Sequence, residues 1–171
     1  MKILIPVDES ECSELALQSV LDRDWAVESQ FRIINVHEPF PFAGVEMYSP
    51  RAAQSVTDAE KDLVKEKRES IGRTVEKFRM RFPSNSVSGD ILTGDIRETI
   101  LSEERDWGAD LIVMGSHKRK GLGRLLLGSV AESVAGNSSC SVEIIKESLH
   151  IDASGESKNE VDTISKGGEC L

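Results

Sequence analysis

The chain has 171 residues and a net charge of −9, the size of a single domain that buries about two-thirds of its unfolded surface. The acidic balance argues against nonspecific nucleic-acid binding, which needs a broad basic face. No run approaches the ~20 apolar residues that cross a bilayer, and the N-terminal apolar run leads directly into acidic residues. We therefore expect no membrane span, no signal peptide and a cytoplasmic location.

The three cysteines and three histidines show no metal-ligand spacing. No C-x-x-C pair occurs, and an odd number of cysteines in a cytoplasmic chain indicates reduced thiols. Cys12 falls on the apolar face of a predicted helix, so we expect it in the core. The sequence therefore predicts no metal site.

The first part of the chain predicts strand, helix and strand. Lys2–Val7 is typical of a buried parallel strand, and Pro6 should end it because proline cannot donate a ladder hydrogen bond. A helix starts after Asp8, and Phe31–Val36 forms the second strand. The helix has one apolar face, formed by Cys12, Leu15, Ala16, Ser19 and Val20.

The middle of the chain combines an irregular segment with a long helix. Glu38–Thr57 contains three prolines among aromatic residues, so we expect no regular element there. Asp58–Phe82 is a long helix that Pro83 ends. Its apolar stripe consists of Val64, Ile71, Val75, Phe78 and Phe82.

The last part again alternates strands and helices. Asp95, with Glu98 three residues later, resembles a helix capping box, and Gly108 is a suitable stop for that helix. The other predicted elements are strands at Val87–Thr93, Leu111–Met114 and Ser141–Lys146 and a helix at Ser129–Asn137.

This alternation predicts one α/β domain over residues 1–146, built on an open parallel sheet with helices on both faces. Ligands of such sheets bind at the carboxyl ends of the strands, where the strand order reverses. Residues 147–171 carry a net charge of −4 and are rich in Ser, Gly, Lys and Glu. We expect them to form a disordered acidic tail.

The segment Leu111–Lys146 carries the clearest functional signal. A loop without acidic residues follows Gly115 and holds four basic residues between Lys118 and Arg124, and Gly128-Ser129 then open a helix. Free N–H groups and the positive end of a helix dipole converge there, which suits a phosphate group. An ordinary strand-to-helix connection with a solvated basic loop is the alternative, and the residues alone do not decide between the two.

The common nucleotide and hydrolase motifs are absent from the sequence. Gly121-Leu122-Gly123 does not continue into G-x-G-x-x-G, and neither a P-loop nor a G-x-S-x-G elbow occurs.

The sequence resembles the universal stress protein family over about Met1–Lys146. The matching stretches, in family order, are KILIPVDESECSELAL, INVHEP, GDIRETIL, ADLIVMGSH, LLGSVAESV and CSVEIIK. The resemblance implies a Rossmann-like fold with an open five-stranded parallel sheet in the strand order 3-2-1-4-5. It also implies a homodimer, commonly formed through the last strand.

The ATP-binding branch of that family carries the motif G-x₂-G-x₉-G-[ST]. Gly115 fits its first position and Gly128-Ser129 fit its last pair, but Lys118 replaces the second glycine. If that position needs φ > 0, a lysine costs about 1–2 kcal/mol, and if it needs close backbone approach, the side chain obstructs. Alternatively, the lysine ammonium pairs with a phosphate. The sequence leaves these alternatives open.

The resemblance places nine residues in an adenine-nucleotide pocket. Pro6 and Asp8 would flank the adenine, and the Asp8 carboxylate would accept a hydrogen bond from the exocyclic amine. Val36 would make a main-chain contact with the base, and Met114 would line the pocket beside the adenine and ribose. The residues expected near the ribose and phosphates are Gly115, Lys118, Gly128, Ser129 and Val130; the last three would offer N–H groups and the Ser129 hydroxyl.

Four of these residues have purely structural alternatives. Pro6 would only end a strand, Asp8 would cap a helix, and Val36 and Met114 would belong to the core.

The leading hypothesis is a stress-associated regulatory homodimer that binds ATP, with or without Mg²⁺, or a related adenine nucleotide. A universal stress protein that binds no ATP and acts as a dimeric interaction module is the alternative, which Lys118 favours. A phosphoacceptor receiver domain would use Asp8-Glu9, but no acceptor aspartate or later lysine is suitably placed. We expect no dedicated enzyme and at most slow ATP hydrolysis, because phosphoryl transfer needs a metal held by placed carboxylates.

Overall fold

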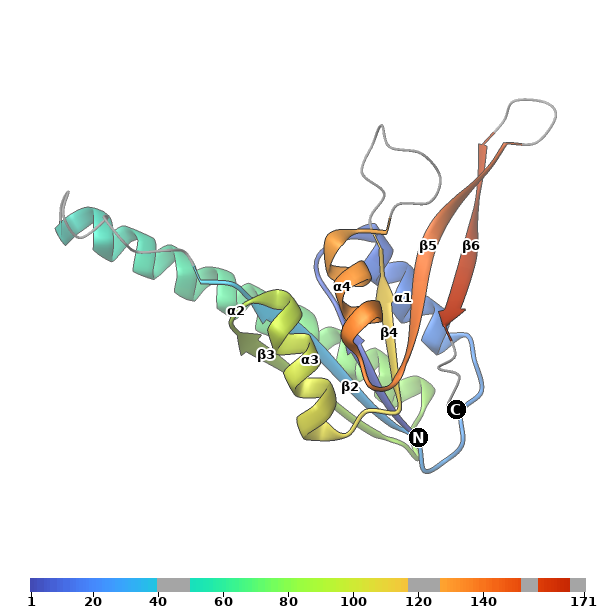
Figure 1. Cartoon of the computed structure of the whole chain (residues 1–171). Helices are drawn as coiled ribbons and strands as arrows, with labels where there is room; N and C mark the ends of the chain where they lie inside the picture. Colours follow the sequence, from blue (N-terminus) through green and yellow to red (C-terminus); the bar gives the residue numbers. More distant parts are fainter. Residues whose placement is uncertain (40–49, 117–126, 152–156, 167–171) are drawn as a thin grey trace.

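The computed structural model describes residues 1–39, 50–116, 127–151 and 157–166. Strands and helices alternate along the chain (Figure 1), as the sequence predicts. In chain order the elements are β1 (Lys2–Pro6), α1 (Glu11–Leu21), β2 (Gln30–His37), α2 (Pro50–Arg81), β3 (Ser86–Thr93), α3 (Ile96–Trp107), β4 (Leu111–Gly115), α4 (Ser129–Asn137), β5 (Ser141–Ile151) and β6 (Ser157–Lys166).

The strands form one sheet in the order β3-β2-β1-β4-β5-β6. Strands β1 to β5 are parallel, and β6 pairs antiparallel with β5. The predicted five-stranded parallel order 3-2-1-4-5 is therefore confirmed. Because the order reverses at β1, the carboxyl ends of β1 and β4 form the switch point at which ligands of such sheets bind.

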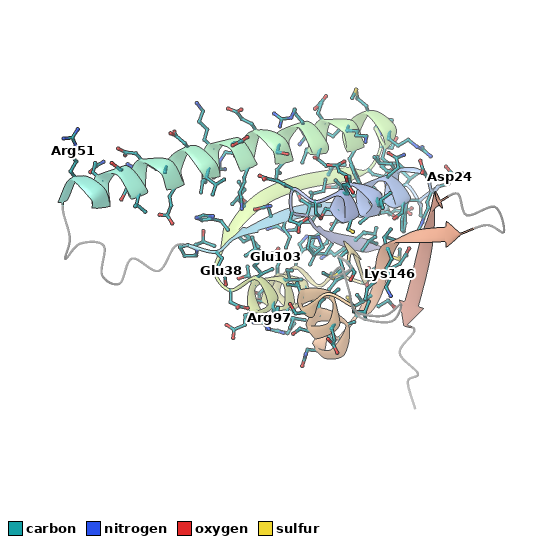
Figure 2. The ribbon with its side chains drawn as sticks, turned by 90° about the horizontal axis from the view of Figure 1, so that it is seen from above. Asp24, Glu38, Arg51, Arg97, Glu103 and Lys146 are labelled. Carbon is teal, nitrogen blue, oxygen red and sulfur yellow. The ribbon has the colours of Figure 1, made fainter. Side chains whose placement is uncertain are left out.

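Two apolar clusters cover the two faces of the sheet. On one face α1 and α2 pack against strand side chains such as Ile3, Ile5 and Ile33, all fully buried. On the other face α3 and α4 pack against Leu4, Ile34 and Ile112. Figure 2 shows this layering, with α1 and α2 on one side of the strands and α3 and α4 on the other.

Several element ends follow local sequence signals. The Asp95 side chain accepts hydrogen bonds from the N–H groups of Arg97 and Glu98, both at 3.0 Å, and these bonds, with that of Glu98 foremost, lower the pKa of the carboxyl group. Gly108 ends α3 in the left-handed conformation (φ 69°), which glycine adopts without strain. Strand β1 ends at Pro6, as expected from its missing N–H group.

Helix α2 begins earlier than the sequence predicts. It starts at Pro50, so residues 50–57 are helical where we expected no regular element. Proline is favoured in the first turn of a helix, and the alanine, arginine and glutamine residues that follow are strong helix formers. The remaining part of that segment, residues 40–49, lies outside the described residues.

The buried face of α1 also differs from the predicted one. Ser13, Leu17 and Leu21 are buried in place of Leu15 and Ser19, which are half-buried. Helix α1 packs over β4 and β5 as well as β1. This placement turns Ser13, Leu17 and Leu21 toward the sheet.

The C-terminal segment forms a strand hairpin where the sequence analysis expected disorder from residue 147. Strand β5 continues to Ile151, and β6 pairs with it from Val142↔Lys166 to Ile151↔Ser157. Figure 1 shows the hairpin extending along the sheet edge opposite β3. The apolar pattern of this segment is too weak to predict a strand from the sequence. The strand is stabilised by pairing with β5 rather than by local propensity.

Candidate functional site

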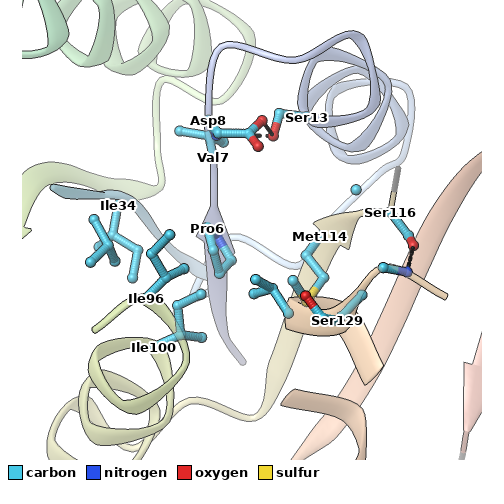
Figure 3. Close-up of a pocket in the computed structure, with 15 residues that line it drawn as sticks. Pro6, Val7, Asp8, Ser13, Ile34, Ile96, Ile100, Met114, Ser116 and Ser129 are labelled. Atoms are coloured by element: carbon cyan, nitrogen blue, oxygen red, sulfur yellow. Dashed lines mark hydrogen bonds between the residues drawn. The ribbon is translucent and has the colours of Figure 1, made fainter. Parts of the chain in front are cut away.

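A cavity of about 260 Å³ lies at the switch point, next to the start of α4 (Figure 3). Parallel strands bring their carboxyl ends to the same edge of the sheet, so residues far apart in sequence meet there. Eight of the nine predicted site residues line this cavity: Pro6, Asp8, Val36, Met114, Gly115, Gly128, Ser129 and Val130. The ninth, Lys118, lies outside the described residues, as does the rest of the basic loop.

Seven further residues line the cavity and were missed by the sequence analysis: Val7, Ser13, Ile34, Ile96, Ile100, Ser116 and Ala131. Ile96 and Ile100 could have been found, because they follow the predicted helix start at the spacing of one helical face. The two serines have no such signal, since they contact the site through tertiary structure. Together the apolar residues give the cavity a hydrophobic lining that suits a flat aromatic ring.

The Asp8 carboxylate is held in place by the start of α1. The buried Ser13 hydroxyl donates to Asp8 Oδ1 at 2.6 Å and accepts from the Asp8 N–H at 3.0 Å (Figure 3). The N–H of Ser10, the N-cap residue of α1, donates to the same Oδ1 at 3.0 Å. Asp8 therefore shapes the turn before the helix, although Ser10 and not Asp8 is its N-cap.

The structure gives a packing reason for glycine at position 115, in addition to the ligand approach expected from the sequence. A Cβ atom at this position would lie 2.3 Å from the carbonyl oxygen of Cys12 and 2.8 Å from the Ser13 nitrogen. Both are main-chain atoms of the first turn of α1, and they cannot move aside as a flexible side chain would. The missing side chain therefore permits close packing of α1 against β4.

The start of α4 is the region in which the sequence predicts phosphate binding. Gly128 is the N-cap and provides no side-chain cap, so the first-turn N–H groups carry the partial positive charge of an uncapped helix end. The Gly128 N–H itself, however, donates to the buried Ser116 hydroxyl at 3.0 Å. Of the three N–H groups predicted to bind phosphate, that of Gly128 is thus engaged within the protein.

Ser116 also fixes the two ends of the intervening loop. Its N–H donates to the Ile145 carbonyl at 3.0 Å while its hydroxyl receives the Gly128 N–H. The chain therefore leaves β4 and enters α4 at one hydrogen-bonded point beside the cavity.

In residues 1–39, 50–116, 127–151 and 157–166, no group of three or more His, Cys, Asp or Glu side chains could hold a metal ion. None of the helices in the same ranges is long and apolar enough to cross a membrane.

Comparison with known proteins gives the family. The model of the universal stress protein family matches residues 1–146, which include every element that lines the cavity. The chain belongs to the universal stress protein family.

Relatives extend over most of the chain. The universal stress protein MJ0531 of Methanocaldococcus jannaschii is 30% identical over 146 residues, covering 85% of this chain and 82% of the relative. The solved structure of MJ0577 is 27% identical, with a TM-score of 0.70, and the match covers 87% of this chain and 97% of that one. An Arabidopsis thaliana universal stress protein solved with AMP bound is 19% identical, with a TM-score of 0.56 over 91% of this chain and 99% of that one.

The packing at Gly115 gives a direct prediction. Gly115→Ala should lower the free energy of unfolding by about 1–3 kcal/mol, because the new methyl group meets main-chain atoms of α1. Gly72→Ala is the matched control: it lies within α2 with open space around its Cα, so it should raise stability by about 0.5–1 kcal/mol. Urea denaturation followed by circular dichroism measures both; equal effects of the two substitutions would contradict this account of Gly115.

Proposed function

We propose that this universal stress protein binds ATP or a related adenine nucleotide in the switch-point cavity and acts as a homodimeric regulatory sensor in the cytoplasm. The observation that carries the proposal is that eight residues, which the family resemblance places in a nucleotide pocket, line one cavity beside an uncapped helix start. Those residues belong to four different elements or their ends, β1, β2, β4 and α4, so most of them are not adjacent in the sequence.

The chemistry of the cavity changes from one end to the other. Pro6, Ile96, Ile100 and Met114 provide apolar surface for a flat base, and the oriented Asp8 carboxylate suits an exocyclic amine as donor. The start of α4, with the exposed Ser129, suits the negative charge of phosphates. An adenine nucleotide combines these features in one molecule.

The comparisons support this choice of ligand. The Arabidopsis relative, solved with AMP bound, has the same fold, so the fold is able to hold an adenine nucleotide. We extend that ability to this chain on the strength of its own cavity.

The proposal concerns binding rather than catalysis. Asp8 is the only carboxylate among the described residues that line the cavity, and phosphoryl transfer needs a metal ion and a positioned nucleophile as well. Mg²⁺ would therefore enter with the nucleotide, held by its phosphates.

We expect a thermal shift with ATP and Mg²⁺. Ligand at a hundred times its Kd should stabilise the protein by about 2.7 kcal/mol, which corresponds to roughly 5–10 °C in Tm. The Lys118→Gly variant, measured in parallel, restores the complete glycine motif. A shift in that variant alone would show that Lys118 closes the site, and would favour the interaction module that binds no ATP.

A charge at the start of α4 should separate binding from stability. Ser129→Asp should preserve or slightly raise stability, because an acidic group is favourable at a helix N-terminus, yet should weaken ATP binding by at least about tenfold through repulsion of the phosphates. Ser129→Asn, of the same shape but neutral, is the control. Isothermal titration calorimetry gives the affinities, and equal ATP affinity of both variants would place the phosphates elsewhere.

The proposed dimer uses the C-terminal edge of the sheet. The strand expected to form the interface, Ser141–Lys146, belongs to β5, and β6 now lies against its outer side. The terminal strand on that side is β6, so an edge-to-edge dimer of the full chain would form through β6.

Light scattering tests this assembly. The full chain should have twice the 18.8 kDa mass of one chain, and deletion of residues 152–171 should yield monomers. A monomeric full chain at tens of micromolar would contradict the homodimer, and a dimeric truncated chain would assign the interface to β5.

A further inference from the structure

The ladder between β1 and β2 stops one hydrogen bond before the geometry requires. The strands are in register up to Pro6↔Ile34, and the Val7 N–H still donates to the Ile34 carbonyl at 2.8 Å. In a parallel ladder the next bond would run from the Val36 N–H to the Val7 carbonyl. Among the described residues, no backbone hydrogen bond joins Val36 to Val7.

A side chain occupies that position instead. Asn35 Nδ2 donates to the Val7 carbonyl oxygen at 2.9 Å. The amide therefore satisfies the acceptor that Val36 would otherwise have used. Strand β2 nevertheless continues to His37 through its pairing with β3, so its backbone remains ordered beyond the point where it leaves β1.

The early end of the β1–β2 ladder affects the main-chain N–H and C=O groups of Val36. Alternate residues of a parallel strand direct their N–H and C=O groups to the same neighbour; since Ile34 directs its carbonyl to β1, Val36 directs its polar groups past the end of β1. Val36 lines the cavity at this point. We propose that Asn35 is a positioning residue that ends the β1–β2 ladder early and keeps the Val36 main chain free to bind the base edge of the nucleotide.

The placement of Asn35 argues against a purely structural role. Its side chain is buried, with 6% exposed, and its Oδ1 has no hydrogen-bond partner within the described part of the chain. A neighbouring cavity of about 20 Å³ has room for one water at most. An apolar residue at this position would avoid the cost of burying an amide and let the ladder continue, so the fold alone does not account for the asparagine.

The proposal rests on the nucleotide-binding function and states how the base would be distinguished. A main-chain N–H and C=O side by side complement adenine, whose ring nitrogen accepts and whose exocyclic amine donates. Guanine presents the opposite order, a ring N–H and a carbonyl, at the corresponding atoms. Asn35 would thus support a preference for adenine over guanine by controlling which main-chain groups are free.

The first test needs no nucleotide. In the ligand-free protein, hydrogen exchange followed by NMR should show the Val36 amide exchanging at least about a hundredfold faster than that of Ile34, which lies within the ladder. In Asn35→Val the Val36 amide should become protected, because it takes over the Val7 carbonyl. Asn35→Asp, which also lacks the amide donor, serves if the valine variant does not fold.

The second test measures the base-dependent part of binding. In Asn35→Val the affinity for ATP should fall about tenfold, whereas the affinity for inorganic triphosphate, which has no base, should not change. Asn85→Ala is the matched control. Its amide also donates to main-chain carbonyls, those of Ala26, Val27 and Ser29, but it precedes β3 at the opposite end of the sheet, so both affinities should stay the same.

The two tests fail separately. If the wild-type protein binds neither ATP nor triphosphate, the proposed nucleotide function is wrong. Asn35 would then have no role in positioning a ligand, even if the exchange data show a free Val36 amide. If ATP binds but the Val36 amide is protected in the ligand-free protein, Asn35 does not free it and this inference is wrong. An equal loss of affinity for ATP and triphosphate in Asn35→Val would likewise overturn it.

Discussion

The close contact between α1 and Gly115 is the constraint on which the site depends. With no Cβ at Gly115, the main chain of Cys12 and Ser13 lies directly against the end of β4. This contact places the Ser13 hydroxyl within reach of Asp8, which is thereby oriented at the end of β1. It also leaves Ser116, the next residue, beside the start of α4. One missing side chain therefore sets the relation between both ends of the cavity.

The elements that could be predicted from the sequence are those with local signals. Asp95 and Gly108 limit α3 through hydrogen bonds and a backbone conformation that involve only neighbouring residues, and the helix at Ser129–Asn137 has the predicted ends. The start of α2 and strand β6 were not predicted. In β6 the order comes from pairing with β5 across a connection, and no single-strand pattern encodes that pairing.

The same distinction applies to the site. Eight of the fifteen residues that line the cavity were predicted, because the family motif and the strand ends are visible in the sequence. Asn35, Ser13 and Ser116 were not, because each acts through a partner that the fold brings near: the Asn35 amide meets a carbonyl 28 residues away. Gly115 was predicted at the right place for an incomplete reason, since a pattern shows that glycine is present but not which atom excludes a side chain.

At the switch point, the fold itself uses some of the main-chain groups that the proposed nucleotide would need. Ser116 takes the N–H of Gly128, while the N–H and C=O of Val7 are taken by Ile34 and Asn35. In our proposal, two polar side chains, Asn35 and Ser116, decide which main-chain groups stay available to a ligand. These groups are the N–H and C=O of Val36 at one end of the cavity and the first-turn N–H groups of α4 at the other. That separation has the polarity of a nucleotide, with a base edge at one end and phosphates at the other. If the proposed nucleotide binds there, a change at Asn35 or Ser116 would alter its recognition without removing a direct contact, because it would change which backbone groups form hydrogen bonds within the fold.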